Sequence, residues 1–213
     1  MNFYFKDELI HLLPEKAAYL PIHRVLLIAD VHLGKASHFR KEGIIIPVPP
    51  ISGDLVSIKK MIQRLNPGTI IFMGDLFHSK LNSEWISLLE FLAAHPEIRF
   101  ILTKGNHDIL PPNIMKYAPI EIVDEFKLGK HLLCTHQPLE EYSHEMLNIA
   151  GHVHPGFLIK TKGRQSFRLP CFYQLQKQLI LPAFGQLTGL HLIKKIPGAR
   201  VFPVLPTEVI EWI

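Results

Sequence analysis

Residues 100–108 read FILTKGNHD, a stretch in which an apolar run gives way to side chains that bind metals and protons. The run Ile98–Thr103 is typical of a buried strand. Asn106, His107 and Asp108 are too polar to continue it, so we expect the strand to end and to deliver them to a cleft. In open α/β sheets, ligands bind beyond the carboxyl ends of the strands.

The same layout recurs along the chain: an apolar run stops, and Asp, Asn or His follows. Singly, each of these motifs is more often a cap or a satisfied polar pair than a metal site. Their joint occurrence in one order argues against coincidence. The runs and their polar ends are Arg24–Ala29 with Asp30 and His32, Thr69–Met73 with Gly74 and Asp75, His131–Thr135 with His136, and Leu147–Ala150 with Gly151, His152 and His154.

Two helices are predicted between the first three strands, over Ser52–Leu65 and Ser83–Ala94, because apolar residues recur there at helical spacing. Strand, helix, strand, helix, strand predicts a parallel sheet with right-handed crossovers. Beyond residue 112, short runs separated by Gly and Pro predict a second, largely antiparallel sheet packed on the first. Shorter predicted features are an edge hairpin, or a loop with a short strand, over 2–20, a short helix over 36–42 and a proline-rich loop over 44–51.

Length and composition favour one globular domain spanning residues 1–213, since the chain has 213 residues and is 47% hydrophobic. Its apolar runs are far shorter than the roughly 18–20 residues of a membrane span. The first residues lack the order of a signal peptide. Cys134 and Cys171 fit no zinc or disulfide framework, so we expect reduced thiols in a cytoplasmic protein without a membrane anchor.

Charge is distributed unevenly along the chain. Residues 146–213 carry 8 basic and 2 acidic groups, and no Asp or Glu occurs between Met146 and Thr207. A basic face attracts polyanions such as nucleic acid. A solvated surface without a partner is the alternative that charge alone leaves open. The basic residues that could line a nucleic-acid path are Lys160, Lys162, Arg164 and Arg168.

The ordered set Asp-x-His, Gly-Asp, Gly-Asn-His-Asp, His and Gly-His-x-His resembles the calcineurin-like metallophosphoesterase superfamily, over roughly residues 24–155. More closely, the segments IADVHLGKASHFRKEGIIIPVP, GDLFHS, AGHVHP and LILPAFGQLTG are similar to the bacterial ligase-associated DNA damage response phosphodiesterases. The resemblance implies the metallo-dependent phosphatase fold, a four-layer α/β/β/α sandwich of two packed mixed sheets.

Carboxylate, imidazole and amide ligands without thiolate suit Mn²⁺, Fe or Zn²⁺ in an open catalytic site. Two such ions, about 3.5–4 Å apart, can hold both the attacking and the leaving oxygen of a phosphoryl group. The resemblance implies two divalent ions, with Mn²⁺ expected, and a hydroxide between them as the nucleophile. It implies Asp75 as the bridging ligand, Asp30, His32 and His154 at the first ion, and Asn106, His136 and His152 at the second.

The resemblance gives His107 the role of general acid or transition-state stabiliser at the leaving oxygen. Asp108 would hold the His107 imidazole in one tautomer, with a turn-capping role as the alternative. Lys35, His38 and Arg40 could meet substrate phosphates, although a solvated helix face would look the same in sequence.

The function expected from these residues is a metal-dependent phosphodiesterase, and the closer resemblance implies an endonuclease that acts on DNA in repair. The resemblance also implies DNA ligase and helicase as repair partners, and it leaves the oligomeric state open. One alternative is a phosphodiesterase or phosphatase for a small nucleotide or a cyclic diester. Another is a non-catalytic scaffold with the same fold, which the complete set of motif residues argues against.

Overall fold

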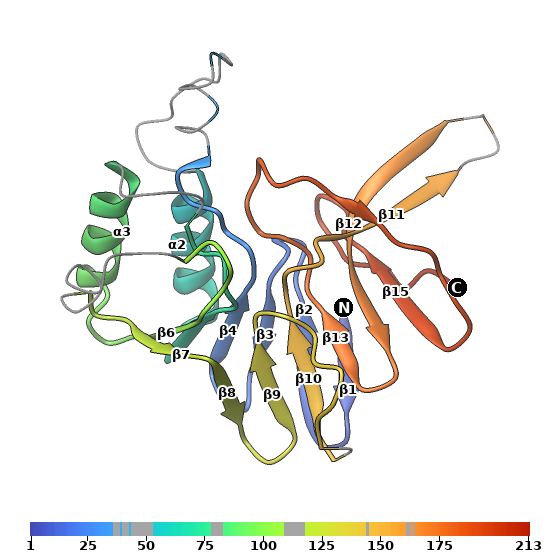
Figure 1. Cartoon of the computed structure of the whole chain (residues 1–213), viewed down its shortest axis with the longest axis horizontal. Coiled ribbons are helices and arrows are strands. Elements are labelled where there is room, and N and C mark those ends of the chain that lie inside the picture. Colours follow the sequence, from blue (N-terminus) through green and yellow to red (C-terminus); the bar gives the residue numbers. More distant parts are fainter. Residues whose placement is uncertain are drawn as a thin grey trace.

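The computed structural model describes residues 1–35, 39, 43, 53–77, 83–108, 118–143, 145–160, 163 and 165–213. In these residues the chain forms two mixed sheets that pack face to face, with two helices on the outer side of the first (Figure 1). The α/β class and the pair of packed mixed sheets are therefore confirmed. The predicted helix over 36–42 lies outside the described residues except for residue 39, and the predicted loop over 44–51 lies outside them entirely.

The first sheet has seven strands, and its centre is parallel as predicted. Strands β4, β5, β6 and β7 run parallel, whereas β1 to β4 pair antiparallel, so the predicted edge hairpin is present. In sheet order the strands are β1 (Asn2–Phe5), β2 (Glu8–Leu12), β3 (Ala18–Leu20), β4 (Val25–Ile28), β5 (Thr69–Phe72), β6 (Arg99–Thr103) and β7 (Glu121–Val123).

Strand β4 shows why the central runs are apolar throughout. Successive side chains point to opposite faces of a sheet. Leu26 and Ile28 pack in the cluster under the helices, while Leu27 packs in the cluster between the sheets. With both faces covered, neither can carry polar residues.

Helices α2 (Gly53–Leu65) and α3 (Ser83–Ala93) cover the first sheet within about a residue of the predicted bounds. Each buries the stripe that its spacing predicts, including Ile58 on α2 and Leu88 on α3, both 0% exposed. None of the described helices is long and apolar enough to cross a membrane.

The second sheet has eight strands and differs from the prediction at its centre. Strands β9, β10 and β13 run parallel there, so the expectation of a largely antiparallel sheet is wrong for these strands. The connection over residues 136–146 is long enough to carry the chain back to the start of a parallel neighbour. The path order is β14 (His191–Leu192), β11 (Pro155–Lys160), β12 (Ser166–Leu175), β13 (Gln178–Ile180), β10 (Leu147–Ala150), β9 (Leu132–Thr135) and β8 (Glu125–Leu128), with β15 (Ala199–Pro203) paired to β12.

Both helices of the described residues lie on the first sheet, and those residues place no helix on the second. The short connections there leave no room for crossover helices. Strands β11 and β12 instead form a hairpin that projects away from the body of the molecule (Figure 1).

Candidate metal centre

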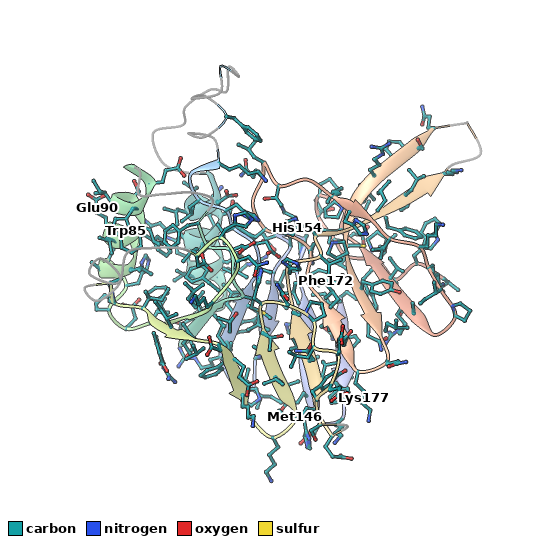
Figure 2. The ribbon with its side chains drawn as sticks, viewed as in Figure 1. Trp85, Glu90, Met146, His154, Phe172 and Lys177 are labelled. Carbon is teal, nitrogen blue, oxygen red and sulfur yellow. The ribbon has the colours of Figure 1, made fainter. Side chains whose placement is uncertain are left out.

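The polar residues that follow the strands meet at one edge of the two sheets. Strand pairing continues past the strand ends, since the backbone N–H of His32 donates to the Asp75 carbonyl at 2.9 Å. In the second sheet, the N–H of Gly151 donates to the His136 carbonyl at 2.9 Å. His154 lies near the middle of the molecule, between the helix-covered sheet and the hairpin (Figure 2). The loops predicted to form the site are therefore brought together.

Asp30, His32 and His154 form the first of two groups that could hold a metal ion. Each offers one ligand atom, and these atoms all lie within 4.8 Å of one another. His154 Nε2 lies 3.3 Å from Asp30 Oδ1. Both atoms are buried and accept or donate no hydrogen bond within the described part of the chain. Buried polar atoms normally have partners, so this pair fits a bound cation.

Asp75, His136 and His152 form the second group, again with ligand atoms within 4.8 Å of one another. The His136 Nδ1–H donates to the Met73 carbonyl at 3.1 Å, which leaves Nε2 as the acceptor nitrogen of the neutral ring. Such a second hydrogen bond fixes the tautomer of metal-binding histidines. His136 Nε2 lies 3.6 Å from Asp75 Oδ1 and 3.1 Å from His152 Nδ1.

The carboxylate of Asp75 lies between the two groups. Its Oδ1 faces His136 of the second group, and its Oδ2 lies 3.9 Å from His32 Nε2 of the first. Asp75 is 2% exposed and Asp30 is 0% exposed, so two carboxylates are buried close together. Buried charges need to be paired or to coordinate metals, and the donor set of carboxylate and imidazole fits a divalent transition metal.

Backbone conformation at the site is unusual. Left-handed φ values occur at five of the candidate ligands, out of ten such non-glycine residues described. This conformation costs on the order of 1–3 kcal/mol per residue and persists only where the surroundings impose it. The five are Asp30 (φ 54°), His32 (φ 52°), Asp75 (φ 47°), His152 (φ 66°) and His154 (φ 52°).

Hydrogen bonds from other loops hold these strained residues in place. The N–H of His152 donates to Asp30 Oδ2 at 2.9 Å, across the two sheets. The N–H of His107 donates to Asp75 Oδ1 at 2.9 Å. Gly151 permits the first contact, because a Cβ there would lie 2.6 Å from Asp30 Oδ2. Desolvation and the neighbouring His136 lower the pKa of His152, which favours the neutral ring that a metal ligand needs.

The loop after β6 places Asn106 and His107 on the surface beside the two groups. Asn106 Oδ1 accepts a hydrogen bond from Gln137 Nε2 at 3.0 Å. The His107 ring centroid lies 5.5 Å from that of His32. Gln137 was not singled out in the sequence; its position next to His136 was the only signal that could have identified it.

Asp108 ties this loop to the one that follows β5. Its Oδ1 accepts the Phe77 N–H at 3.2 Å, and its Oδ2 accepts the Gly105 N–H at 2.9 Å. Burial raises the pKa of the Asp108 carboxyl, and these two hydrogen bonds oppose that effect. The bonds are those of the turn-capping alternative, and orientation of the His107 imidazole by Asp108 stays a prediction.

Of the three residues expected to meet substrate, only Lys35 lies in the described part of the chain. Its N–H donates to the His32 carbonyl at 3.2 Å, and desolvation lowers the pKa of its half-buried ammonium group. His38 and Arg40 lie outside the described residues. The two cysteines, Cys134 and Cys171, are free thiols, and burial raises the pKa of each to about 12.

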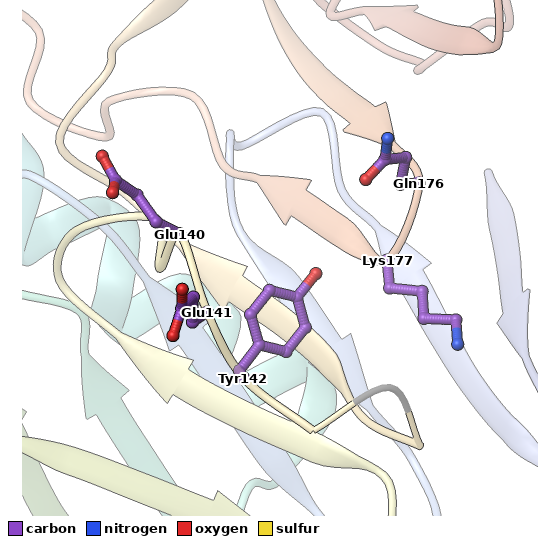
Figure 3. Close-up of a pocket in the computed structure, with 5 residues that line it drawn as sticks. All are labelled: Glu140, Glu141, Tyr142, Gln176 and Lys177. Atoms are coloured by element: carbon purple, nitrogen blue, oxygen red, sulfur yellow. The ribbon is translucent and has the colours of Figure 1, made fainter.

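A pocket elsewhere on the second sheet, with a volume of about 640 Å³, contains none of the candidate ligands. Figure 3 shows Glu140, Glu141, Tyr142, Gln176 and Lys177 around it.

Two packed mixed sheets with a carboxylate–imidazole centre at their strand tips define a metal-dependent phosphoesterase. The family model of calcineurin-like phosphoesterases matches residues 23–176, and the chain belongs to this family of hydrolases. The first of the predicted resemblances is thereby confirmed.

One solved structure supports this assignment, and a second is reported beside it. The nuclease MPE of Pseudomonas putida is 26% identical, with a TM-score of 0.79 over 100% of this chain and 99% of that chain. YfcE, a phosphoesterase from E. coli, is 11% identical, with a TM-score of 0.48 over 88% of this chain and 97% of that chain. No curated protein matches the chain. The likeness to a nuclease is consistent with the closer resemblance noted in the sequence.

Proposed function

We propose that this chain is a two-metal phosphodiesterase that cleaves nucleic acid. The observation that carries the proposal is the position of the buried Asp75 carboxylate between two separate ligand groups. A full-length likeness to a nuclease supports nucleic acid as the substrate. Mn²⁺ is the proposed metal, with Fe or Zn²⁺ as the alternatives that the same donor atoms accept.

We assign the candidate ligands to two ions. Asp75 would bridge them, because each of its oxygens faces a different group. Asn106 would join the second ion through Oδ1, which Gln137 holds in place. Asp30, His32 and His154 would then hold the first ion, and Asn106, His136 and His152 the second.

A bound pair of ions would supply an activated water and neutralise charge on the phosphoryl oxygens. The chain itself supplies the proton for the leaving oxygen, and we assign this role to His107. Its ring is exposed to an incoming substrate, while its backbone N–H is fixed on Asp75. Asp108 acts as a positioning residue, since its carboxylate holds the loop that carries His107.

The surface position of the site favours a long substrate. Asn106, His107 and His152 are all exposed, whereas sites for small molecules are usually concave and enclose most of the ligand. We therefore favour nucleic acid over a small nucleotide or a cyclic diester. Endonuclease action and DNA repair with ligase and helicase partners follow from the sequence resemblance and belong to the same proposal. A cytoplasmic setting, expected from the composition of the chain, belongs to it as well.

The proposal is tested by metal content and by turnover of a generic aryl phosphodiester with Mn²⁺. Wild type should contain divalent metal and hydrolyse the diester. His107→Ala should keep its metal and lose about 10²-fold in turnover, the typical effect of removing a general acid. His11→Ala, a histidine on β2 away from the centre, serves as the control and should match wild type.

Three results would count against this assignment. A wild-type protein with no turnover would be a scaffold and not an enzyme. Release of phosphate from small monoesters, with no cleavage of single-stranded or duplex DNA, would favour the small-nucleotide alternative. Equal turnover in wild type and His107→Ala would remove His107 from the mechanism.

A further inference from the structure

The β11–β12 hairpin starts at the metal centre and extends outward from it. Strand β11 begins at Pro155, directly after the candidate ligand His154. The hairpin projects beyond the body of the molecule (Figure 1). Any extended molecule that passes out of the site along this side would therefore run beside the hairpin.

One face of the hairpin carries two exposed cations. Directly paired residues of neighbouring strands share a face. Leu158 pairs with Arg168, and Lys160 pairs with Ser166, two residues further along. Lys160 and Arg168 therefore lie on the same face, and both are exposed.

This basic face adjoins the segment over residues 185–190, which lies beside the candidate ligand Asp30. Gly156 lies on the same face, and a Cβ there would lie 2.8 Å from Leu190 Cβ, so Leu190 packs over it. Leu190 lies at the end of the segment over residues 185–190. At the start of this segment, the Gly185 N–H donates to the Asp30 carbonyl at 3.2 Å. The opposite face turns away from this segment, since Phe157 there packs against Trp212 at 6.0 Å between ring centroids.

Among the described residues, no acidic side chain pairs with these two cations. No Asp or Glu occurs between Met146 and Thr207. Arg200 is paired with Glu211 at 2.7 Å, but neither Lys160 nor Arg168 forms an ion pair with any residue of the described ranges. Their charge is therefore available to an anionic partner.

The distance from the candidate ligand His154 to the two cations sets the minimum length of that partner. Arg168 lies opposite Leu158, four residues beyond His154, and Lys160 lies six residues beyond it. At about 3.3 Å per residue, these positions are roughly 13 Å and 20 Å along the strand from the ligand. A mononucleotide in the site does not span that distance, whereas a chain of several nucleotides does.

We propose that Lys160 and Arg168 form a phosphate-binding arm that holds a nucleic-acid strand several nucleotides away from the bond that is cut. The inference rests on the proposed function, because it takes the scissile phosphate to lie at the metal centre. Phosphate contacts of this kind position a strand without reading its sequence. The arm therefore sets a minimum substrate length and not a sequence preference.

The test compares wild type with the double variant Lys160→Ala/Arg168→Ala. The control is Lys127→Ala/Lys130→Ala, which removes two exposed cations at the opposite edge of the same sheet. Binding of fluorescein-labelled single-stranded DNA of about 2 and about 20 nucleotides is measured by fluorescence anisotropy, in EDTA so that no cleavage occurs. Turnover of the aryl phosphodiester with Mn²⁺ is measured in parallel.

The arm variant should bind the long strand about 10-fold more weakly at low salt. Its plot of log affinity against log salt should be shallower by about 1.4, the effect of two lost phosphate contacts at roughly 0.7 each. Its affinity for the short strand and its turnover of the aryl diester should equal those of wild type, as should every property of the control.

Equal affinity and salt dependence in wild type and the arm variant would overturn the arm. An equal loss in the control would also overturn it, because the effect would then reflect net charge alone. Absence of aryl diester turnover in wild type would refute the proposed function without affecting the binding comparison, so the two failures are distinguishable.

Discussion

Asp75→Asn tests whether one carboxylate serves both metal ions. Asp75 is the residue whose two oxygens lie near the ligands of both groups, 3.6 Å from His136 Nε2 and 3.9 Å from His32 Nε2. Asparagine has the same shape and keeps a carbonyl oxygen to accept the His107 N–H. The change replaces one oxygen by an amide that cannot bind a cation, and it removes the negative charge.

The expected loss of stabilisation by metal follows from the linkage between ion binding and folding. An ion present at about 100 times its dissociation constant stabilises the fold by about 2.7 kcal/mol, so two ions contribute about 5 kcal/mol. In a chain of this size, 1 kcal/mol shifts Tm by roughly 2–4 °C. Mn²⁺ should therefore raise the Tm of the wild-type protein by about 10–20 °C, and that of Asp75→Asn by less than about 5 °C.

The assay is thermal unfolding in EDTA and then in excess Mn²⁺, with metal per chain measured by elemental analysis. In EDTA the two proteins should differ by no more than about 1 kcal/mol, because the hydrogen bond from His107 is retained. Asp124→Asn, an exposed aspartate between β7 and β8, should respond to Mn²⁺ like wild type. If Asp75→Asn bound as much metal and gained as much in Tm as wild type, Asp75 would not be a shared ligand.

Two further substitutions test other parts of the site and its surroundings. Gly151→Ala would place a Cβ 2.6 Å from Asp30 Oδ2, so it should destabilise the fold by about 1–3 kcal/mol and reduce the rise in Tm with Mn²⁺. Gly189→Ala is the control, because no atom lies within 4 Å of the added Cβ, and it should change neither the stability nor the rise in Tm. Asp54→Asn tests an acid outside the site, where burial raises the pKa from 3.8 to about 6. The folded protein keeps a proton there that the unfolded chain loses, so the stability of wild type falls from about pH 4 to about pH 6 and then levels off. Between about pH 4 and about pH 6, denaturant unfolding should show the stability of Asp54→Asn rising relative to that of wild type by about 1–2 kcal/mol. A stability difference that does not change with pH would contradict the raised pKa of Asp54.

The sequence predicted the elements whose pattern of apolar residues follows from their burial. Strands β4, β5 and β6 are apolar throughout because helices cover one face and the second sheet covers the other. Helices α2 and α3 carry apolar stripes because one side faces that core and the other faces water. In each case the residue pattern follows directly from burial, and the bounds agree with the structure within about one residue.

Elements that depend on a neighbour were not predicted. Strand β7 (Glu121–Val123) and strand β8 (Glu125–Leu128) are short and largely exposed, so their residues carry little pattern of their own. They are strands because β6 and β9 offer open edges to pair with. Likewise, Glu208–Trp212 is one of the short runs after residue 112 that predict strands of the second sheet, and it forms only isolated bridges, at Val209 and Trp212. Strand direction in the second sheet is set by its connections, which pattern alone does not reveal.

At the site, the sequence predicted which side chains meet, but not which oxygen of each carboxylate accepts a backbone hydrogen bond and which lies near a candidate ligand. In Asp30, Oδ2 accepts the His152 N–H and holds a loop from the other sheet, while Oδ1 lies beside His154. In Asp75, Oδ1 holds the His107 loop, and Oδ2 lies toward His32. One oxygen of each carboxylate thus fixes the backbone of a second loop and keeps left-handed residues such as His152 in place. The geometry for metal binding is consequently supported by hydrogen bonds between loops of the chain, and a motif of residue types carries no trace of them.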